Sequence, residues 1–233
     1  MISAPYAVTA AAGLPETDLP DSLLSRLPES VAPAPWNTKC QVVTWHHPAD
    51  AAAIETFPPA IRPSGVALVA WALVRYAETP VGPYSEIAVT VLPDDGDGYG
   101  HIPFIVVDSL PSIVGGRVNW MLPKALAGFD WSDGDLSVNI VSEVPEQPEW
   151  RISVRCTPED TAMPATLPSH VRQAGVDGAV GHVDSELVGS LAAAAVVVDG
   201  EATGPLGALL RPGGYDGAIL RDCEFNVGPL VTA

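Results

Sequence analysis

Positive charge is scarce in this sequence. Lysine and arginine together number 11 against 28 aspartates and glutamates, so the formal net charge is −17 at pH 7. Nucleic acids and anionic membranes attract basic proteins, and this balance therefore argues against both as partners. An anionic substrate would need a local cation to overcome the general field. Each basic residue thus carries more information than usual.

Cysteine is also scarce, and its spacing excludes two common roles. Cys40, Cys156 and Cys223 are odd in number, widely separated and form no C-x-x-C pair. A disulfide framework needs pairs, and a zinc site needs closely spaced ligands. We expect three buried, reduced thiols. His46 and His47 would point to opposite faces of an extended chain, so we place them in a solvated turn and expect no metal.

Long hydrophobic runs are missing. No uninterrupted apolar segment approaches the roughly 20 residues of a membrane span. No lysine or arginine precedes Arg26, whereas a secretory signal begins with basic residues. We therefore expect a cytoplasmic protein with no membrane partner.

The signatures of common enzyme sites are missing as well. The sequence has no G-x-S-x-G, no H-E-x-x-H, no phosphate-binding P-loop and no G-x-G-x-x-G between a strand and a helix. Residues 94–98 resemble a calcium loop only in part, because the closing glutamate is absent, and a hairpin turn fits better. We expect no cofactor, so an enzyme built from this chain would use one of its own side chains as the reactive group.

What the sequence does have is a succession of short β-prone segments. Its 21 glycines and 24 prolines are spread between Val/Ile/Leu-rich runs, a pattern that favours strands and turns over a helical bundle. At 233 residues and 47% hydrophobic content, one core is the simplest expectation. The expected strands are residues 40–45, 66–76, 84–92, 101–108, 136–143, 150–156, 191–198, 204–210 and 217–227, with a weaker one at 180–182.

Few helices are expected. The segment 22–27 follows Asp21, a possible N-cap, and the segment 49–57 is closed by two prolines. Residues 1–35 are rich in alanine and proline and are expected to form an N-terminal arm that packs on the domain or on a neighbouring subunit. Residues 36–233 are expected to form one β domain, with a proline-rich loop between 157 and 168.

Lys124 is one of only two lysines, and no immediate neighbour offers it a carboxylate. It follows Leu122-Pro123 and precedes Ala125-Leu126-Ala127. An ammonium group taken out of water without a partner tends to lose its proton and become a nucleophilic amine. The alternative is that the four-carbon stem crosses an apolar edge and places the charge in solvent. Composition alone favours that alternative.

The residues around Lys124 form a recognisable pattern. Gly116-Arg117 followed by Leu122-Pro123-Lys124, after a strand with Tyr84-Ser85-Glu86, resembles the acetoacetate decarboxylase family. The resemblance implies a mostly β (α+β) fold, an antiparallel β-barrel or cone with a few short flanking helices. It also implies that Lys124 forms a Schiff base with a substrate ketone and that Glu86 faces the same pocket. Weaker similarity runs from Trp36 to the end of the chain.

Two departures from the family pattern bear on the pocket. Ala125 stands where the decarboxylase has a second lysine, which removes one means of lowering the pKa of Lys124. Trp71 stands where the decarboxylase has a further pocket carboxylate. Lys39 is the nearest candidate for a basic pocket residue. The pocket is therefore expected to be more apolar and to suit a larger or more hydrophobic keto substrate. The expected substrate-binding residues are Arg117, Trp71, Tyr84, Trp120 and Lys39.

The resemblance implies a lyase that acts through a lysine iminium on a keto acid or related ketone, of the decarboxylase or the aldolase/dehydratase type. At an ordinary pKa of about 10.4, roughly one lysine in 2,500 is neutral at pH 7, so the amine must be activated. Two alternatives stay open: a non-covalent cyclase or isomerase of secondary metabolism, and a non-catalytic small-molecule-binding protein. Relatives are commonly oligomeric, so a homo-oligomer is expected.

Overall fold

Strands dominate the fold. A computed structural model describes residues 7–132 and 136–232, and within them the strands form one sheet in the order β10-β8-β7-β6-β5-β4-β3-β2-β1-β9. The strands are β1 (Trp36–Pro48), β2 (Val66–Glu78), β3 (Tyr84–Pro93), β4 (His101–Val107), β5 (Lys124–Ser132), β6 (Ser137–Ser142), β7 (Trp150–Ala174), β8 (Val180–Ala202), β9 (Gly213–Val227) and β10 (Val231–Thr232).

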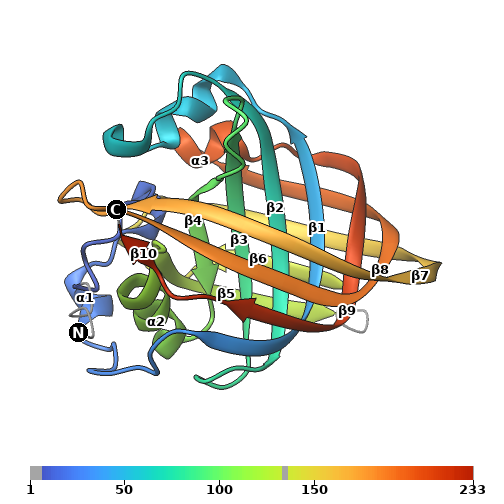
Figure 1. The fold of residues 1–233 in the computed structure, drawn as a ribbon, viewed down its shortest axis with the longest axis horizontal. Coiled ribbons are helices and arrows are strands. Elements are labelled where there is room, and N and C mark those ends of the chain that lie inside the picture. The colour runs from blue at the N-terminus through green and yellow to red at the C-terminus, as the bar shows by residue number, and fades with distance from the viewer. Residues whose placement is uncertain (1–6, 133–135, 233) are drawn as a thin grey trace.

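The sheet closes on itself because β9 pairs with both β1 and β8. The result is a barrel whose paired strands are antiparallel, except that β4 and β5 are parallel (Figure 1). A parallel pair needs a crossover connection, and α2 (Leu110–Trp120) supplies it between these two strands. The mostly β fold class expected from the sequence is confirmed.

The remaining helices are short and flank the barrel. The expected segment at 22–27 is α1, and the one at 49–57 is the 3-10 helix η2. These elements are η1 (Pro15–Thr17), α1 (Asp21–Leu24), η2 (Ala51–Thr56), η3 (Pro59–Ile61) and α3 (Gly204–Leu209).

Three expectations about local structure are wrong. The expected strand at 204–210 is instead the helix α3 over Gly204–Leu209, because Pro205 occupies the first turn, where its missing N–H costs nothing, while Leu206 and Leu209 are buried one turn apart. The expected loop at 157–168 belongs to β7. His46 and His47 lie in β1, where the ring of buried His47 contacts the backbone oxygen of Leu209.

The pairing of β7 explains how a strand can run through a proline-rich segment. β7 pairs with β8 from Trp150 to Ala174, with one irregularity between Pro158 and Ala162. On its other side, pairing with β6 ends at Arg155, and beyond it the described residues add only a single bridge at Val171. Proline cannot donate to a ladder, so it is tolerated where one side of the strand is open.

The barrel interior is filled by one face of each strand. In β3 the side chains of Ile87, Val89 and Val91 are fully buried in this interior core. Successive side chains of a strand point to opposite faces, so Glu86, Ala88 and Thr90 lie on the other face, which lines a cavity. In Figure 1 the ribbons of β7 and β8 cross in front of β1, β2 and β3, and residues from both layers line that cavity.

Residues 7–35 pack on the barrel's own strands. The backbone N–H of Leu14 donates to Pro103 and that of Ala12 to Ala174. The three cysteines are free and buried, as expected. Across the described ranges, no helix combines the length and the apolar character needed to cross a membrane.

Candidate active site

Lys124 is placed by the sharp end of α2. The helix stops at Met121, which adopts the left-handed conformation with φ 55°, and the N–H groups of Met121 and Leu122 donate back to Arg117 and Gly116. This αL termination satisfies the last carbonyls of the helix. The chain then turns into β5, of which Lys124 is the first residue, and its side chain is only 4% exposed.

The ammonium group of Lys124 has three partners. Its Nζ donates to Glu86 Oε2 at 2.6 Å, to Ser112 Oγ at 3.1 Å and to Tyr84 Oη at 3.4 Å. An ammonium carries three N–H donors, so each has an acceptor. Glu86 and Tyr84 come from β3, and Ser112 comes from the first turn of α2.

The charge on Lys124 is stabilised. Burial acts to lower the pKa of Lys124, but the attraction of Glu86, with a smaller contribution from Tyr84, outweighs it, so the pKa lies above its ordinary value. The resting lysine is therefore an ammonium ion paired with a carboxylate. Lys124 is thus neither the charge placed in solvent that composition favoured nor the unpartnered amine that was its alternative, because both considered only its immediate sequence neighbours.

Glu86 has a second partner that sequence reasoning did not identify. The hydroxyl of Tyr76 donates to Glu86 Oε1 at 3.3 Å. Burial, followed by the charge of Glu86, raises the pKa of Tyr76 well above its ordinary value, so this phenol stays protonated. The rings of Tyr76 and Tyr84 lie 4.4 Å apart. Glu86 is thus held between a phenol and the ammonium group.

A cavity of about 260 Å³ begins at this cluster. Its walls come from β1 to β4 on one side and from β7, β8 and β9 on the other. Among the described residues that line it, only Lys124 and Glu86 are charged. The wall is otherwise mostly apolar, with Val42, Val74 and Leu220 as examples.

Four of the expected site residues meet at this cavity: Lys124, Glu86, Tyr84 and Trp120 all line it. The indole N–H of Trp120 donates to the backbone oxygen of Gly228 at 2.7 Å, and its ring meets Trp36 edge to face at 5.0 Å. The indole is therefore fixed as a wall of the cavity.

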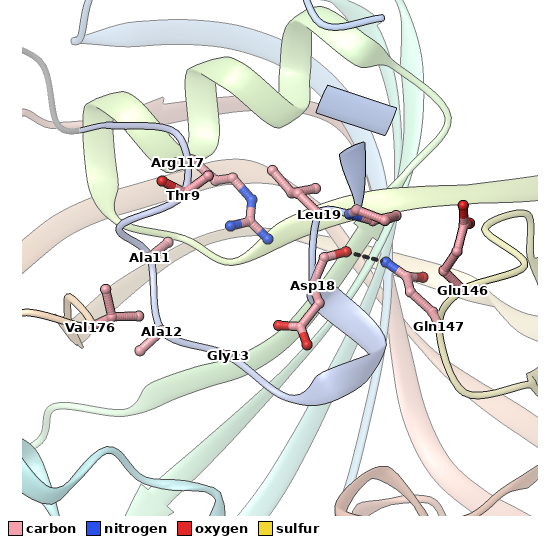
Figure 2. Close-up of a pocket in the computed structure, with 11 residues that line it drawn as sticks. Thr9, Ala11, Ala12, Gly13, Asp18, Leu19, Arg117, Glu146, Gln147 and Val176 are labelled. Carbon is pink, nitrogen blue, oxygen red and sulfur yellow. Dashed lines mark hydrogen bonds between the residues drawn. The ribbon is translucent and has the colours of Figure 1, made fainter. Parts of the chain in front are cut away.

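Arg117 lies close to Lys124 but faces away from the cavity. Its Nε donates to the backbone oxygen of Lys124 at 2.7 Å, and its two terminal nitrogens donate to Val8 and Thr17. Burial lowers the pKa of Arg117 to about 10. Figure 2 shows its guanidinium in a separate pocket beside Asp18. Arg117 therefore positions the backbone of Lys124 and does not contact the cavity expected to hold substrate.

Lys39 and Trp71 do not line the cavity either. The Lys39 side chain is 60% exposed, and its Nζ pairs with Glu78 Oε1 at 3.1 Å. Trp71 stacks on Trp45 inside the barrel, with ring centroids 5.9 Å apart. Strand alternation explains the placement of Trp71, because its neighbour Ala72 is the residue that faces the cavity.

Ser112 and Tyr76 are the site residues that sequence reasoning missed. The alternation along β2, in which Ala72, Val74 and Tyr76 share one face, could have indicated Tyr76 once the cavity face was known. No signal pointed to Ser112, because α2 itself was not expected. Over the described part of the chain, no group of three His, Cys, Asp or Glu side chains could hold a metal ion.

Comparison with known proteins identifies the family. The family model described as acetoacetate decarboxylase (ADC) matches residues 22–164. No curated protein sequence matches the chain closely enough to count as a relative.

Solved structures share the fold at low identity. The enduracididine biosynthesis enzyme MppR complexed with pyruvate superposes with a TM-score of 0.58 and 14% identity over 87% of this chain and 91% of its own. A structure of an acetoacetate decarboxylase gives the same four values. The acetoacetate decarboxylase from Legionella pneumophila gives a TM-score of 0.55 and 14% identity over 88% of this chain and 91% of its own.

Proposed function

This chain belongs to the acetoacetate decarboxylase family, and we propose that it is a lyase in which Lys124 forms an iminium ion with a ketone or keto acid. The observation that carries the proposal is the pairing of a buried Lys124 Nζ with Glu86 Oε2, 2.6 Å away, at the wall of an apolar cavity. Stability alone does not account for this pair, because a buried ion pair is often no more stabilising than apolar side chains of the same volume.

Glu86 is the group that activates the lysine in this proposal. Transfer of a proton from Lys124 Nζ to Glu86 Oε2 converts two charges into a neutral amine and a carboxylic acid. A substrate that displaces water from the cavity favours this neutral pair, because charges lose solvation there. A neighbouring cation is not required. Ala125, which stands where the decarboxylase has its second lysine, is fully buried in the barrel core.

The amine then attacks the carbonyl carbon of the substrate. The carbonyl oxygen takes the proton held by Glu86, which gives a carbinolamine, and a further proton, released from the nitrogen, allows that oxygen to leave as water. The product is a cationic iminium beside the Glu86 carboxylate. Tyr84 Oη, 3.4 Å from Nζ, is a second group able to pass protons within the cluster.

The iminium is the electron acceptor for bond cleavage. When a bond to the atom next to the former carbonyl carbon breaks, its electron pair moves into the iminium and leaves an enamine. Loss of CO2 and retro-aldol cleavage follow this route, and loss of water follows from the enamine after an α-proton is removed. Protonation of the enamine and addition of water return free Lys124 and the product.

Reductive trapping tests the proposal, and the chain offers a matched control. Borohydride reduces an iminium to a stable amine, so incubation with a methyl ketone should leave an adduct on Lys124 that peptide mass mapping locates. The only other lysine, Lys39, is exposed and paired with Glu78. The Lys39→Met variant should still be labelled at Lys124, whereas Lys124→Met should lose that label.

The same variants separate the alternatives. Turnover of a substrate by Lys124→Met or Lys124→Arg would contradict the covalent mechanism and support a non-covalent cyclase or isomerase. A folded protein that no carbonyl compound labels at Lys124, and that turns none over, would be a binding protein instead.

A further inference from the structure

We propose that the substrate enters this cavity uncharged, as a ketone with an apolar chain, and that the iminium serves aldol or dehydration chemistry rather than loss of CO2. The inference rests on the iminium mechanism proposed above and adds the class of substrate to it. It narrows the choice between keto acids and ketones that the family resemblance leaves open.

The charges of the cavity are the first argument. Among its described lining residues, Lys124 and Glu86 are the only charged groups, and they already neutralise each other at 2.6 Å. A substrate carboxylate would be a second anion competing with Glu86 for one ammonium group. After condensation the balance is the same, because the iminium carries one positive charge. A keto acid would thus leave one net negative charge in an apolar cavity, which is unfavourable.

The placement of the other cations is the second argument. Arg117 and Lys39, the two basic residues among the expected substrate-binding residues, both point elsewhere. Lys39 lies in solvent with Glu78, and the three nitrogens of Arg117 donate to backbone carbonyls of Lys124, Val8 and Thr17. No described lining residue contributes a guanidinium to the cavity.

The shape and polarity of the wall indicate what fits instead. Along β3 the cavity face runs from Glu86 through Ala88 to Thr90, so the charged end gives way to an uncharged one about 13 Å away at the usual rise per residue. Leu167, Pro168 and Ser169 of β7 line the cavity and are exposed, so they form its mouth.

The size of the cavity indicates how large a part of the substrate it can enclose. Its volume of about 260 Å³ equals that of about nine water molecules at their share of the liquid. A carbonyl compound of about ten non-hydrogen atoms would fill it. A methyl ketone with a seven-carbon chain has that size and no charge.

Two pairs of compounds, each a ketone and its matched keto acid, test the inference. One pair is methyl heptyl ketone and the keto acid in which the last methyl group of its chain is a carboxylate. The other pair is methyl propyl ketone and levulinate, which differ in the same way with the carboxylate closer to the carbonyl. Each compound is incubated with the folded protein and borohydride, and the initial rate of adduct formation at Lys124 is divided by the rate at Lys39. The exposed Lys39 corrects for the intrinsic reactivity of each compound.

The ratio of the Lys124 rate to the Lys39 rate should be at least about tenfold higher for the uncharged member of each pair. This is because one unpaired buried charge costs at least about 1.4 kcal/mol, which corresponds to a factor of ten. Equal or faster labelling of Lys124 by the keto acids would overturn the inference and leave the iminium mechanism standing. If no compound labels Lys124, the proposed function itself fails.

A variant that adds a cation provides a second measurement. Thr90→Arg places a guanidinium on the cavity face of β3 without adding a lysine, and Thr90→Gln is its uncharged control. The arginine variant should raise the labelling ratio of the long-chain keto acid, and the glutamine variant should not. An unchanged ratio in a folded Thr90→Arg protein would argue that charge does not limit entry.

Discussion

The two lysines of this chain show that burial changes the energetic effect of a lysine–glutamate ion pair. Lys39 and Lys124 each pair with a glutamate, at 3.1 Å and 2.6 Å respectively, but the first pair is exposed and the second is buried. An exposed pair contributes about 0–1 kcal/mol to stability. A buried ammonium that loses its carboxylate is left without compensation, so the second pair controls the protonation state of Lys124.

Glu86→Gln should therefore lower the pKa of Lys124 below its value in the unmodified protein. The amide removes the attraction that now outweighs burial, and burial alone disfavours the ammonium form. The pH dependence of Lys124 acylation, followed by peptide mass mapping, measures this pKa. Glu78→Gln, which removes the exposed partner of Lys39, is the control and should leave the pKa of Lys124 unchanged. A pKa of Lys124 that stays in place in Glu86→Gln would show that Glu86 does not hold the charge.

At the residue scale the sequence predicts the charged part of the site and misses its hydroxyl partners. Lys124, Glu86 and Tyr84 follow from short motifs and do meet. Trp71 was misplaced because β2 is apolar on both faces. Lys39 was misplaced because composition does not distinguish a surface cation from a pocket cation. Only the closed barrel shows which face of β2 meets the cavity, and thus that Tyr76 belongs to the site.

The helix α2 and the strand β5 together position the side chain of Lys124. A Cβ built on Gly116 would lie 2.4 Å from Lys124 Cδ and 2.7 Å from both Cε and Cγ. The stem of the lysine therefore crosses α2 at a glycine, and a methyl group there would displace it. Gly116 belongs to the Gly-Arg motif, so the structure gives that motif a steric reason.

Gly116→Ala should weaken the site and the fold together. Replacing an exposed helical glycine with alanine stabilises the helix by about 1 kcal/mol. Adding a methyl group to a full interior instead costs about 1–3 kcal/mol. We expect a lower free energy of unfolding in urea and a trapping rate at Lys124 reduced about tenfold, which corresponds to ~1.4 kcal/mol. Gly214→Ala is the control, because its Cβ would meet nothing within 4 Å. A stabilised Gly116→Ala protein with normal trapping would contradict this account of α2.

At the element scale, regular strands were predictable and their exceptions were not. The apolar runs of β2, β3 and β4 mark buried strands directly. The Gly-Pro start of α3 misleads because proline is also accepted in the first turn of a helix. The prolines of β7 mislead, because their acceptance depends on whether a neighbouring strand needs the missing N–H. That depends on the pairing of distant segments, which local sequence does not record.

The fold also buries a titratable group that does not line the cavity of the lysine site. His101, the first residue of β4, is 1% exposed and its ring lies 5.0 Å from that of Phe57. Burial lowers the pKa of His101 from 6.5 to about 4. The folded protein thus keeps this ring neutral at a pH where the unfolded chain binds a proton.

The stability of the protein should therefore fall as the pH decreases from 6.5 to 4. Over that range the unfolded state binds more protons at His101 than the folded state does, so the contribution of His101 is complete above pH 6.5 and is lost below it. The expected loss is about 3 kcal/mol. Urea unfolding of the unmodified protein and of His101→Gln at several pH values isolates this contribution as their difference. His46→Gln, which removes an exposed histidine of β1, is the control substitution. A His101→Gln curve that runs parallel to the curve of the unmodified protein would contradict the assignment.

The net charge of the whole molecule and the lining of the cavity both disfavour an anionic substrate. A net charge of −17 repels anions from the surface, and the cavity within presents no unpaired cation among its described residues. The composition indicated only that an anionic substrate would need a local cation, and both charged residues that line the cavity, Lys124 and Glu86, are already paired with each other. The position of the cavity between two layers of one closed sheet could not be predicted, because it depends on the pairing of β9 with both β1 and β8.

The central claim is that Lys124 condenses with a carbonyl group, and exchange of the carbonyl oxygen tests it most directly. Methyl heptyl ketone is incubated with the protein in water labelled with the heavy oxygen isotope, and mass spectrometry follows the isotope in the ketone. Formation and hydrolysis of an iminium replace the ketone oxygen with oxygen from water, even when no further reaction occurs. We predict exchange well above the buffer rate for the unmodified protein and for Lys39→Met, and exchange at the buffer rate for Lys124→Met. Exchange that is equal in Lys124→Met and in the unmodified protein would contradict the account.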